Sequence, residues 1–261
     1  CRTVADPREI RTFTAGFEDR LYDERADAAA VAAHLGTTHM ELDVKPSLDG
    51  IVDRIVEMYD EPFADSSAIP TWLVCREARR HVTVALTGDG GDEAFCGYDR
   101  YRAMHLAATM SPTKFFAVRV LAALAGPFAR GGERSRLRRL RRFVKILHNS
   151  PAAQYFQLRS LFSREDLGRL LGEAVLDEGL QAWPEEWFTS LYEDANFDDE
   201  AKYAQRHDLL TYLPDDLLVK ADIASMASSL ELRSPMLDHE VVEAGLSLPL
   251  ELRIDAGDAD G

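Results

Sequence analysis

The chain has 261 residues, of which 46% are hydrophobic and 29% charged, and its formal net charge at pH 7 is −15. This composition is typical of a globular protein with one large domain or two small ones. The acidic excess disfavours a nucleic-acid binder that works through its overall field, and no apolar run approaches the roughly 20 residues that span a membrane. We therefore expect no nucleic acid and no membrane among the partners.

The three cysteines, Cys1, Cys75 and Cys96, are scattered and lack the spacing of metal ligands. This pattern favours free thiols in a reducing compartment, so we expect a cytoplasmic protein. Cys1 has no glycine-rich turn or evident base beside it, which argues against a nucleophilic role. Because the chain does not begin with a methionine, we expect it to be a fragment of a longer protein.

The first part of the chain predicts an alternating α/β unit. Arg11–Phe17 predicts a strand, Glu24–Leu35 an alanine-rich helix, and Thr38–Val44 a second strand. Gly36, just past the helix, suits its C-cap. Such short connections predict parallel neighbours joined by a right-handed crossover.

Two further helices lead to a third strand. Apolar residues at helical spacing predict an amphipathic helix over Ser47–Tyr59, and Pro70 suits the first position of a helix that continues over Thr71–Arg80. The β-branched run Val82–Leu86 then predicts a buried strand.

Glycines alternate with carboxylates directly after this strand, in the sequence GDGGDE from Gly88 to Glu93. A strand followed by a glycine-rich turn and a helix is the usual place for a ligand, at the carboxyl ends of a parallel sheet. Asp89, Asp92 and Glu93 would repel one another unless a cation or a basic partner joins them. The alternative is a solvated acidic loop without a ligand.

Strand signals disappear after Tyr101, and the rest of the chain predicts helices. Ser150 before a proline, and the capping-box sequence SRED from Ser163, each predict a helix start. Arg134–Leu147 predicts a basic helix that could bind a phosphate, an acidic partner or RNA. A solvated face is the commoner role of such a run.

A second polar cluster lies near Lys220, which ends the apolar run Leu217–Val219. A lysine held by apolar neighbours near acids can bind phosphate or donate a proton, whereas a lone lysine is more often a surface residue with a buried stem. Core positions are predicted at Met226, Leu230 and Leu232, and an ion pair or rim position at Glu231 and Arg233.

Three long segments together resemble the synthetase domain of the glutamine-hydrolysing asparagine synthetases. They are DEPFADSSAIPTWL over Asp60–Leu73, LTGDGGDEAFCGYDRY over Leu86–Tyr101 and YLPDDLLVKADIASMASSLELRSPMLD over Tyr212–Asp238. TFTAGF from Thr12 and HLGTTHMEL from His34 fit the same domain. The resemblance covers nearly the whole chain and is least clear in its middle.

The resemblance implies an α/β fold of the adenine-nucleotide α-hydrolase type, with a parallel sheet followed by a mostly helical half. We expect residues 1–103 to form the nucleotide-binding α/β part and residues 104–261 the helical part that completes the domain. In this family ATP, with Mg²⁺, adenylates a side-chain carboxylate and releases pyrophosphate. Ammonia from an N-terminal glutaminase domain of the parent chain then attacks the acyl-adenylate and releases AMP.

Aspartate is the expected carboxylate substrate. Similar enzymes amidate or cyclise other carboxylates, so an amidotransferase or cyclase with another acceptor is the alternative. The sequence leaves the oligomeric state open, including a homodimer.

The resemblance also assigns roles to residues at matching positions. Ala15, Thr87 and Gly88 are expected to line the ATP site through their backbones. Asp89 stands where the family has the acid of its G-[DE]-G loop, which is linked to the acyl-adenylate. Asp92 is expected to assist the binding of Mg²⁺ and pyrophosphate.

Four more residues complete the expected site. Lys220 is expected to neutralise phosphate charge, and Asp65, Ser66 and Ser67 are expected on the side of the carboxylate substrate.

The family's S-G-G-x-D-S pyrophosphate loop, which lies on a central strand of its sheet, is not in this sequence. We therefore predict a gap in the sheet beside Thr12–Phe17 and Val82–Leu86, and little or no activity of the isolated chain. A non-catalytic nucleotide-binding module that has lost the loop is a second hypothesis. A nucleic-acid binder that acts through Arg134–Lys145 is a third.

Overall fold

A computed structural model describes residues 6–16, 23, 25–43, 50–111, 113, 116–118, 120, 144, 146–147, 149–172, 184–194 and 196–254. The chain divides into two compact units. Cys1–Asp89 and Pro214–Pro235 belong to the first, and Gly90–Leu213 and Met236–Gly261 to the second. This division differs from the single boundary predicted after residue 103, because a late segment of the chain returns to the first unit.

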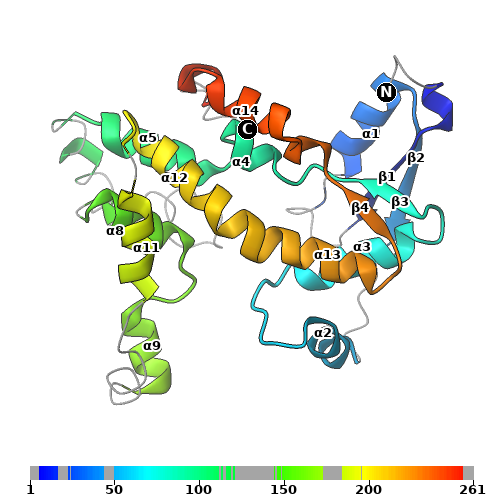
Figure 1. The fold of residues 1–261 in the computed structure, drawn as a ribbon, viewed down its shortest axis with the longest axis horizontal. Coiled ribbons are helices and arrows are strands. Elements are labelled where there is room, and N and C mark those ends of the chain that lie inside the picture. The colour runs from blue at the N-terminus through cyan, green and yellow to red at the C-terminus, as the bar shows by residue number, and fades with distance from the viewer. Residues whose placement is uncertain are drawn as a thin grey trace. The chain divides into compact units, whose positions relative to one another are not determined.

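Two parallel strands open the first unit. β1 (Arg11–Gly16) pairs with β2 (Thr38–Asp43), and α1 (Arg25–Leu35) connects them (Figure 1). The register places Arg11 opposite Thr38 and Gly16 opposite Asp43. The predicted β-α-β order is confirmed, although Phe17 and Glu24 lie outside the described residues.

A second pair of strands joins distant parts of the chain. β3 (Val84–Leu86) pairs in parallel with β4 (Glu231–Arg233), so Val84 lies opposite Glu231 (Figure 1). The expectation that strands end near Tyr101 is therefore wrong. A three-residue strand with a single apolar side chain gives no periodic pattern, which is why β4 escaped the sequence analysis.

Besides α1, the described part of the first unit contains the helices α2 (Ile51–Tyr59), α3 (Ala68–Ala78) and α13 (Leu218–Met226). α3 begins two residues before Pro70, whereas the sequence predicted Pro70 at its start. The apolar core includes Leu42, Leu73 and Leu230. Met226 was predicted in the core but is 58% exposed, because the buried positions of α13 lie on another face of the helix.

The described part of the second unit is mainly helical, as predicted. Ser150 caps α8 through Ala153 N, and Ser163 and Asp166 form the predicted capping box. The predicted basic helix over Arg134–Leu147 lies almost entirely outside the described residues. The helices are α4 (Gly91–Phe95), α5 (Asp99–Thr109), α8 (Pro151–Arg159), α9 (Arg164–Leu171), α11 (Pro184–Glu193), α12 (Glu200–Leu210) and α14 (His239–Ser247), with the 3₁₀ turn η5 (Leu250–Leu252).

A π-helical turn, η3 (Leu213–Leu217), connects α12 to α13. Cys75 and Cys96 are buried free thiols. Cys1 lies outside the described residues.

Candidate active site

A cavity of about 1120 Å³ lies in the first unit along the edges of β1 and β3. It is lined by the consecutive residues Arg11–Ala15 and by every residue of β3. Side chains of a strand alternate between its two faces, so a cavity on one face would contact every second residue. Contact with consecutive residues indicates that the cavity follows the strand edges.

Among the described residues, β1 pairs only with β2, and β3 only with β4. Near the start of both strands, Nη1 of Arg11 donates to the carbonyl oxygen of His81 at 3.0 Å. A long side chain, rather than a backbone ladder, thus links β1 to the chain before β3. The predicted gap in the sheet is present in this part of the structure.

β3 also has an uncovered apolar side. Val84 is 40% exposed and Leu86 is 70% exposed, although both stand on a strand of β-branched and aliphatic residues. In a parallel α/β sheet both faces are normally covered. The first unit therefore offers both an unpaired edge and an uncovered face at β3.

Polar groups gather where β3 ends. Thr87, Asp89 and Lys220 line the same cavity as Ala15 near the end of β1. Oγ1 of Thr87 donates to Oδ2 of Asp89 at 2.7 Å and lies 2.7 Å from Oγ of Ser234, which must be the donor of the second bond because Thr87 has only one hydroxyl proton. Four predicted site residues thus line one cavity, and three of them, Ala15, Thr87 and Asp89, lie at the carboxyl ends of β1 and β3, where such sheets bind ligands.

Lys220 reaches this cavity from α13 and is held by the loop before α3. Its Nζ donates to Oδ2 of Asp65 at 2.6 Å and to Oγ of Ser67 at 2.7 Å. The Lys220 and Asp65 side chains are 12% and 17% exposed. Burial acts to raise the pKa of Asp65, but the bonds from Lys220 and Ser67 outweigh it and hold that pKa below its usual value.

This arrangement gives Asp65 and Ser67 a visible task, which is to hold the Lys220 ammonium. The sequence predicts them beside the carboxylate substrate, and that role stays a prediction. Ser66 is exposed and Gly88 is exposed too. A Cβ added at Gly88 would meet no atom within 4 Å, so its backbone lies open to an approaching ligand.

Asp92 belongs to the second unit, in the short helix α4. The preceding Gly90 has φ of +88°, and a Cβ there would lie 2.1 Å from Leu237, so the turn requires glycine. Asp92 is exposed, whereas the neighbouring Glu93 is 1% exposed and accepts a hydrogen bond from the Tyr98 hydroxyl at 2.6 Å. Of these two adjacent acids, only Asp92 is open to a ligand.

No group of three His, Cys, Asp or Glu side chains in the described ranges is arranged to hold a metal ion. Mg²⁺ commonly binds through one or two carboxylates together with substrate phosphates. A single exposed carboxylate such as that of Asp92 fits this mode of binding, and it does not fit a site made by protein ligands alone.

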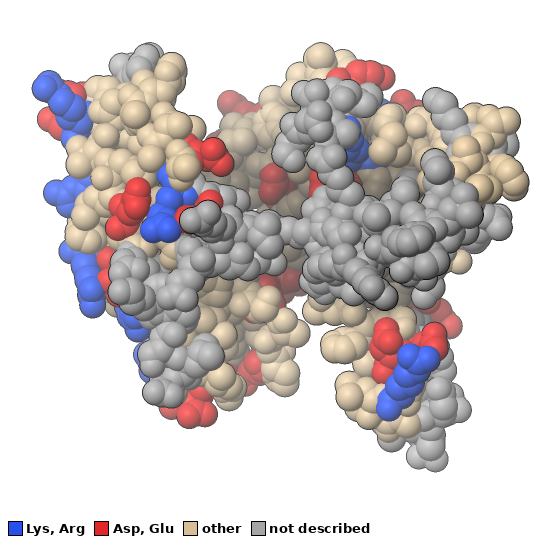
Figure 2. All heavy atoms as spheres, turned by 180° about the vertical axis from the view of Figure 1, so that it is seen from behind, with Lys and Arg blue, Asp and Glu red and all other residues tan. Residues whose placement is uncertain are grey.

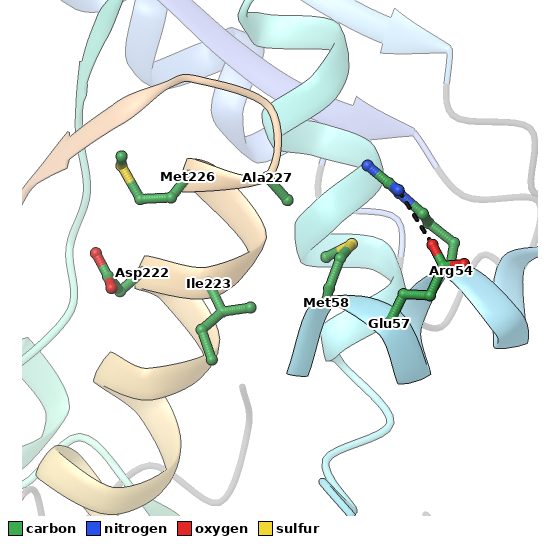
Figure 3. A pocket seen from close by; sticks show the side chains of 7 residues that line it. All are labelled: Arg54, Glu57, Met58, Asp222, Ile223, Met226 and Ala227. Atoms are coloured by element: carbon green, nitrogen blue, oxygen red, sulfur yellow. Dashed lines mark hydrogen bonds and ion pairs between the residues drawn. The ribbon is translucent and has the colours of Figure 1, made fainter. Parts of the chain in front are cut away.

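A second cavity of about 490 Å³ lies between α2 and α13. Ile223 of α13 points toward α2 and Met58, whereas Asp222 and Met226 point to the other side of α13 (Figure 3). Arg54 pairs with Glu57 at 3.3 Å on the same helix. None of the predicted site residues lines this cavity, and its one charged pair is local to α2.

The described surface carries both signs of charge. On the face drawn in Figure 2, basic and acidic side chains are intermixed. The third hypothesis, a nucleic-acid binder, depends on Arg134–Lys145, which lie almost entirely outside the described residues, so it stays a prediction. Within the described ranges, no helix has the length and hydropathy needed to cross a bilayer.

Comparison with known proteins gives one consistent result. A sequence model of the asparagine synthase family matches residues 2–259. The chain is 32% identical to asparagine synthetase [glutamine-hydrolyzing] 1 of Bacillus subtilis, over 95% of this chain and 38% of that protein. It is 36% identical to a putative asparagine synthetase [glutamine-hydrolyzing] of Mycobacterium tuberculosis, over 95% of this chain and 37% of that protein. The chain thus spans well under half the length of these relatives.

Proposed function

The chain belongs to the asparagine synthase family, and on this premise we propose that it is the ATP-dependent, amide-forming part of a glutamine-hydrolysing synthetase. The observation that carries the proposal is that Ala15, Thr87, Asp89 and Lys220 all line one cavity. A cavity whose wall includes a hydroxyl, a carboxylate and an ammonium suits a nucleotide with its phosphates.

In the proposed reaction, a carboxylate oxygen of the substrate attacks the α-phosphorus of ATP, and the bond to pyrophosphate breaks. Ammonia then attacks the acyl carbon, loses a proton, and displaces AMP. A carboxylate is a poor electrophile until its oxygen becomes part of a good leaving group, which the adenylate supplies. Cationic groups must offset the charge that builds on the phosphates.

Lys220 is the proposed source of fixed positive charge. An ammonium has three N–H donors, and Asp65 and Ser67 take two of them. The third is then available to a phosphate oxygen in the cavity that Lys220 lines. Asp65 and Ser67 keep the ammonium in place, and they need not contact the substrate.

Asp89 is proposed to act on the acyl-adenylate, and its carboxylate is oriented by the hydrogen bond from Thr87. Thr87, Gly88 and Ala15 are proposed to contact the nucleotide through their backbones. Asp92 would hold Mg²⁺ together with the phosphates, where the ion would offset charge on the departing pyrophosphate. Ser66, which is exposed, stays a proposed contact of the carboxylate substrate.

Aspartate is the proposed acceptor, and ammonia is proposed to come from a glutaminase part of the longer protein, as in the names of the relatives. The test is ATP–pyrophosphate exchange by the natural protein with aspartate, glutamate and larger carboxylates offered one at a time. Exchange that depends on one carboxylate supports the proposal and identifies the acceptor. ATP binding that saturates without any exchange would instead support the non-catalytic module.

The isolated chain of 261 residues is proposed to be inactive. Among the described residues, no strand pairs with the second edge of β1 or of β3, which the cavity follows. Pyrophosphate release from ATP by these residues alone, at a rate comparable to that of the natural protein, would refute this part of the proposal.

A further inference from the structure

The helix that carries Asp92 is too short to be stable without outside support. α4 has five residues, whereas an isolated helix needs about 12 to 15 residues to form in water. The residue that closes it, Cys96, has φ of 60°, which is unusual for a residue other than glycine. Contacts from elsewhere in the second unit must therefore fix the path of α4.

Gln205 of α12 supplies the main polar contact. Its Nε2 donates to the carbonyl oxygen of Glu93 at 2.7 Å and to that of Ala94 at 2.9 Å. Carbonyls in the last turn of a helix have no partner within the helix, and the Gln205 amide satisfies two of them. Gln205 is 2% exposed, so water does not readily replace it.

Arg253, directly after η5, fixes the orientation of this amide. Its Nη1 donates to Oε1 of Gln205 at 2.9 Å and lies 3.6 Å from Sγ of Cys96. Because the guanidinium can only donate, Oε1 must face Arg253 and Nε2 must face α4. Gln205 and Arg253 thus connect the last described residues of the chain to α4, the helix that carries Asp92.

Close contacts at two glycines, Gly245 and Gly97, also leave α4 little freedom to move. A Cβ on Gly245 of α14 would lie 2.9 Å from the Ala94 carbonyl oxygen, so α14 lies close against α4. A Cβ on Gly97 would lie 2.0 Å from Oδ1 of Asp92. The Asp92 carboxylate therefore rests against the backbone of Gly97, and a shift of α4 moves it directly.

We propose that Gln205, oriented by Arg253, is a positioning residue that holds Asp92 for the binding of pyrophosphate with Mg²⁺. The proposal rests on the role proposed for Asp92 above. It makes a distinct claim, because it states that the buried amide of Gln205, more than 100 residues away in the chain, fixes the position of the Asp92 carboxylate.

The test compares two buried glutamines in the natural protein. Gln205→Ala removes the contact with α4, and Gln154→Ala is the matched control. Gln154 is 8% exposed and its Nε2 donates to the carbonyl oxygen of Asn149 at 2.9 Å, in the same unit. Both changes remove a buried amide from a backbone carbonyl, so both lower the melting temperature.

Calorimetry then measures the binding of pyrophosphate in the presence of Mg²⁺, and separately the binding of AMP. Gln205→Ala is expected to weaken pyrophosphate binding about 10- to 100-fold, the size expected from misplacing a ligating group by about 1 Å. AMP binding should stay within a factor of about two, since AMP lacks the phosphates that Asp92 assists. Gln154→Ala should change neither.

Two further variants test the proposal if Gln205→Ala fails to fold. Gln205→Glu keeps the shape of the side chain but places oxygen against the two carbonyls, and it is expected to weaken pyrophosphate binding as well. Arg253→Met releases the orientation of the amide and should have a smaller effect in the same direction.

The proposal is overturned if the wild-type protein does not bind pyrophosphate, if Gln205→Ala binds it as the wild type does, or if Gln154→Ala loses it equally. Carboxylate-dependent exchange by the wild type is measured in parallel and decides the proposed function separately. A protein that exchanges but shows no effect at Gln205 would retain its function and lose only this positioning role.

Discussion

Asp65 and Asp208 both accept hydrogen bonds from basic side chains, but the surroundings of the two carboxylates differ. Asp208, in the second unit, is 0% exposed and accepts hydrogen bonds from Nε of Arg100 and the Tyr101 hydroxyl, each at 2.8 Å, and from Arg159. Asp65, in the first unit, is bound to Lys220 at the wall of the large cavity.

The difference lies in what surrounds each pair. The guanidinium of Arg100 lies 3.6 Å from the ring centre of Tyr98, and that of Arg159 lies 4.2 Å from the ring centre of Tyr212. Such a cluster is closed by aromatic rings and holds the helices together. The pair at Asp65 keeps one member, Lys220, at the wall of a cavity, where we propose that its charge faces a ligand.

The largest effect on stability is expected at Asp208. Asp208→Asn removes a fully buried carboxylate from two partly buried arginines and should lower the free energy of unfolding by about 3 to 5 kcal/mol. Chemical denaturation of the purified chain measures it. The control is Asp198→Asn, in an exposed pair with Lys202, which should leave the denaturation midpoint nearly unchanged.

Lys220→Met tests the other side of the comparison. We expect exchange activity of the natural protein to fall about 10²- to 10³-fold, because a fixed positive charge at the phosphates is lost. Stability should fall less than in Asp208→Asn, since Asp65 keeps the hydrogen bonds from Ser67. Lys202→Met serves as the control, and near-normal exchange in Lys220→Met would show that this lysine is only structural.

Lowering the pH should reduce the stability of the second unit through the protonation of His207. Burial lowers the pKa of this imidazole to about 4, against about 6.5 in the unfolded chain. The unfolded state therefore takes up the proton first, and stability that is full above pH 6.5 is lost as the pH falls toward 4. The loss should be about 3 kcal/mol.

Denaturation curves at several pH values check this expectation, with His207→Gln as the neutral variant and the exposed His239→Gln as the control. His207→Gln should remove most of the pH dependence in this window. A wild-type chain whose stability is flat between pH 6.5 and 4 would contradict the assignment.

Thr87 is expected to show the smallest effect. Thr87→Val removes the hydroxyl that bonds Asp89 and Ser234 and should cost about 1 kcal/mol of stability and reduce exchange. Thr87→Ser keeps the hydroxyl and should be nearly neutral in both assays. Equal behaviour of the two variants would mean that the hydroxyl does not orient Asp89.

The sequence predicted the first β-α-β unit, the gap in the sheet and the grouping of Ala15, Thr87, Asp89 and Lys220. These rest on local patterns, such as glycines beside acids at a strand end, and on long motifs. The gap followed from a motif that the sequence lacks. The gap could be predicted from the sequence because the family places that motif on a central strand of its sheet.

Other features depend on contacts between distant parts of the chain. β4 is too short for a periodic pattern, and the bonds from Lys220 to Asp65 and Ser67 join residues about 150 positions apart. Gln205 gave no signal either, because a glutamine within a helix is usually an exposed residue. Only the fold reveals that this one faces the carbonyls of α4.

The most direct test of the account is carboxylate-dependent ATP–pyrophosphate exchange by the natural protein, compared between the wild type and Asp89→Asn. The account predicts exchange that requires a carboxylate substrate in the wild type and a loss of at least about 100-fold in the variant. Absence of exchange in the wild type, or equal exchange in Asp89→Asn, would contradict the claim that this cavity is an adenylating site.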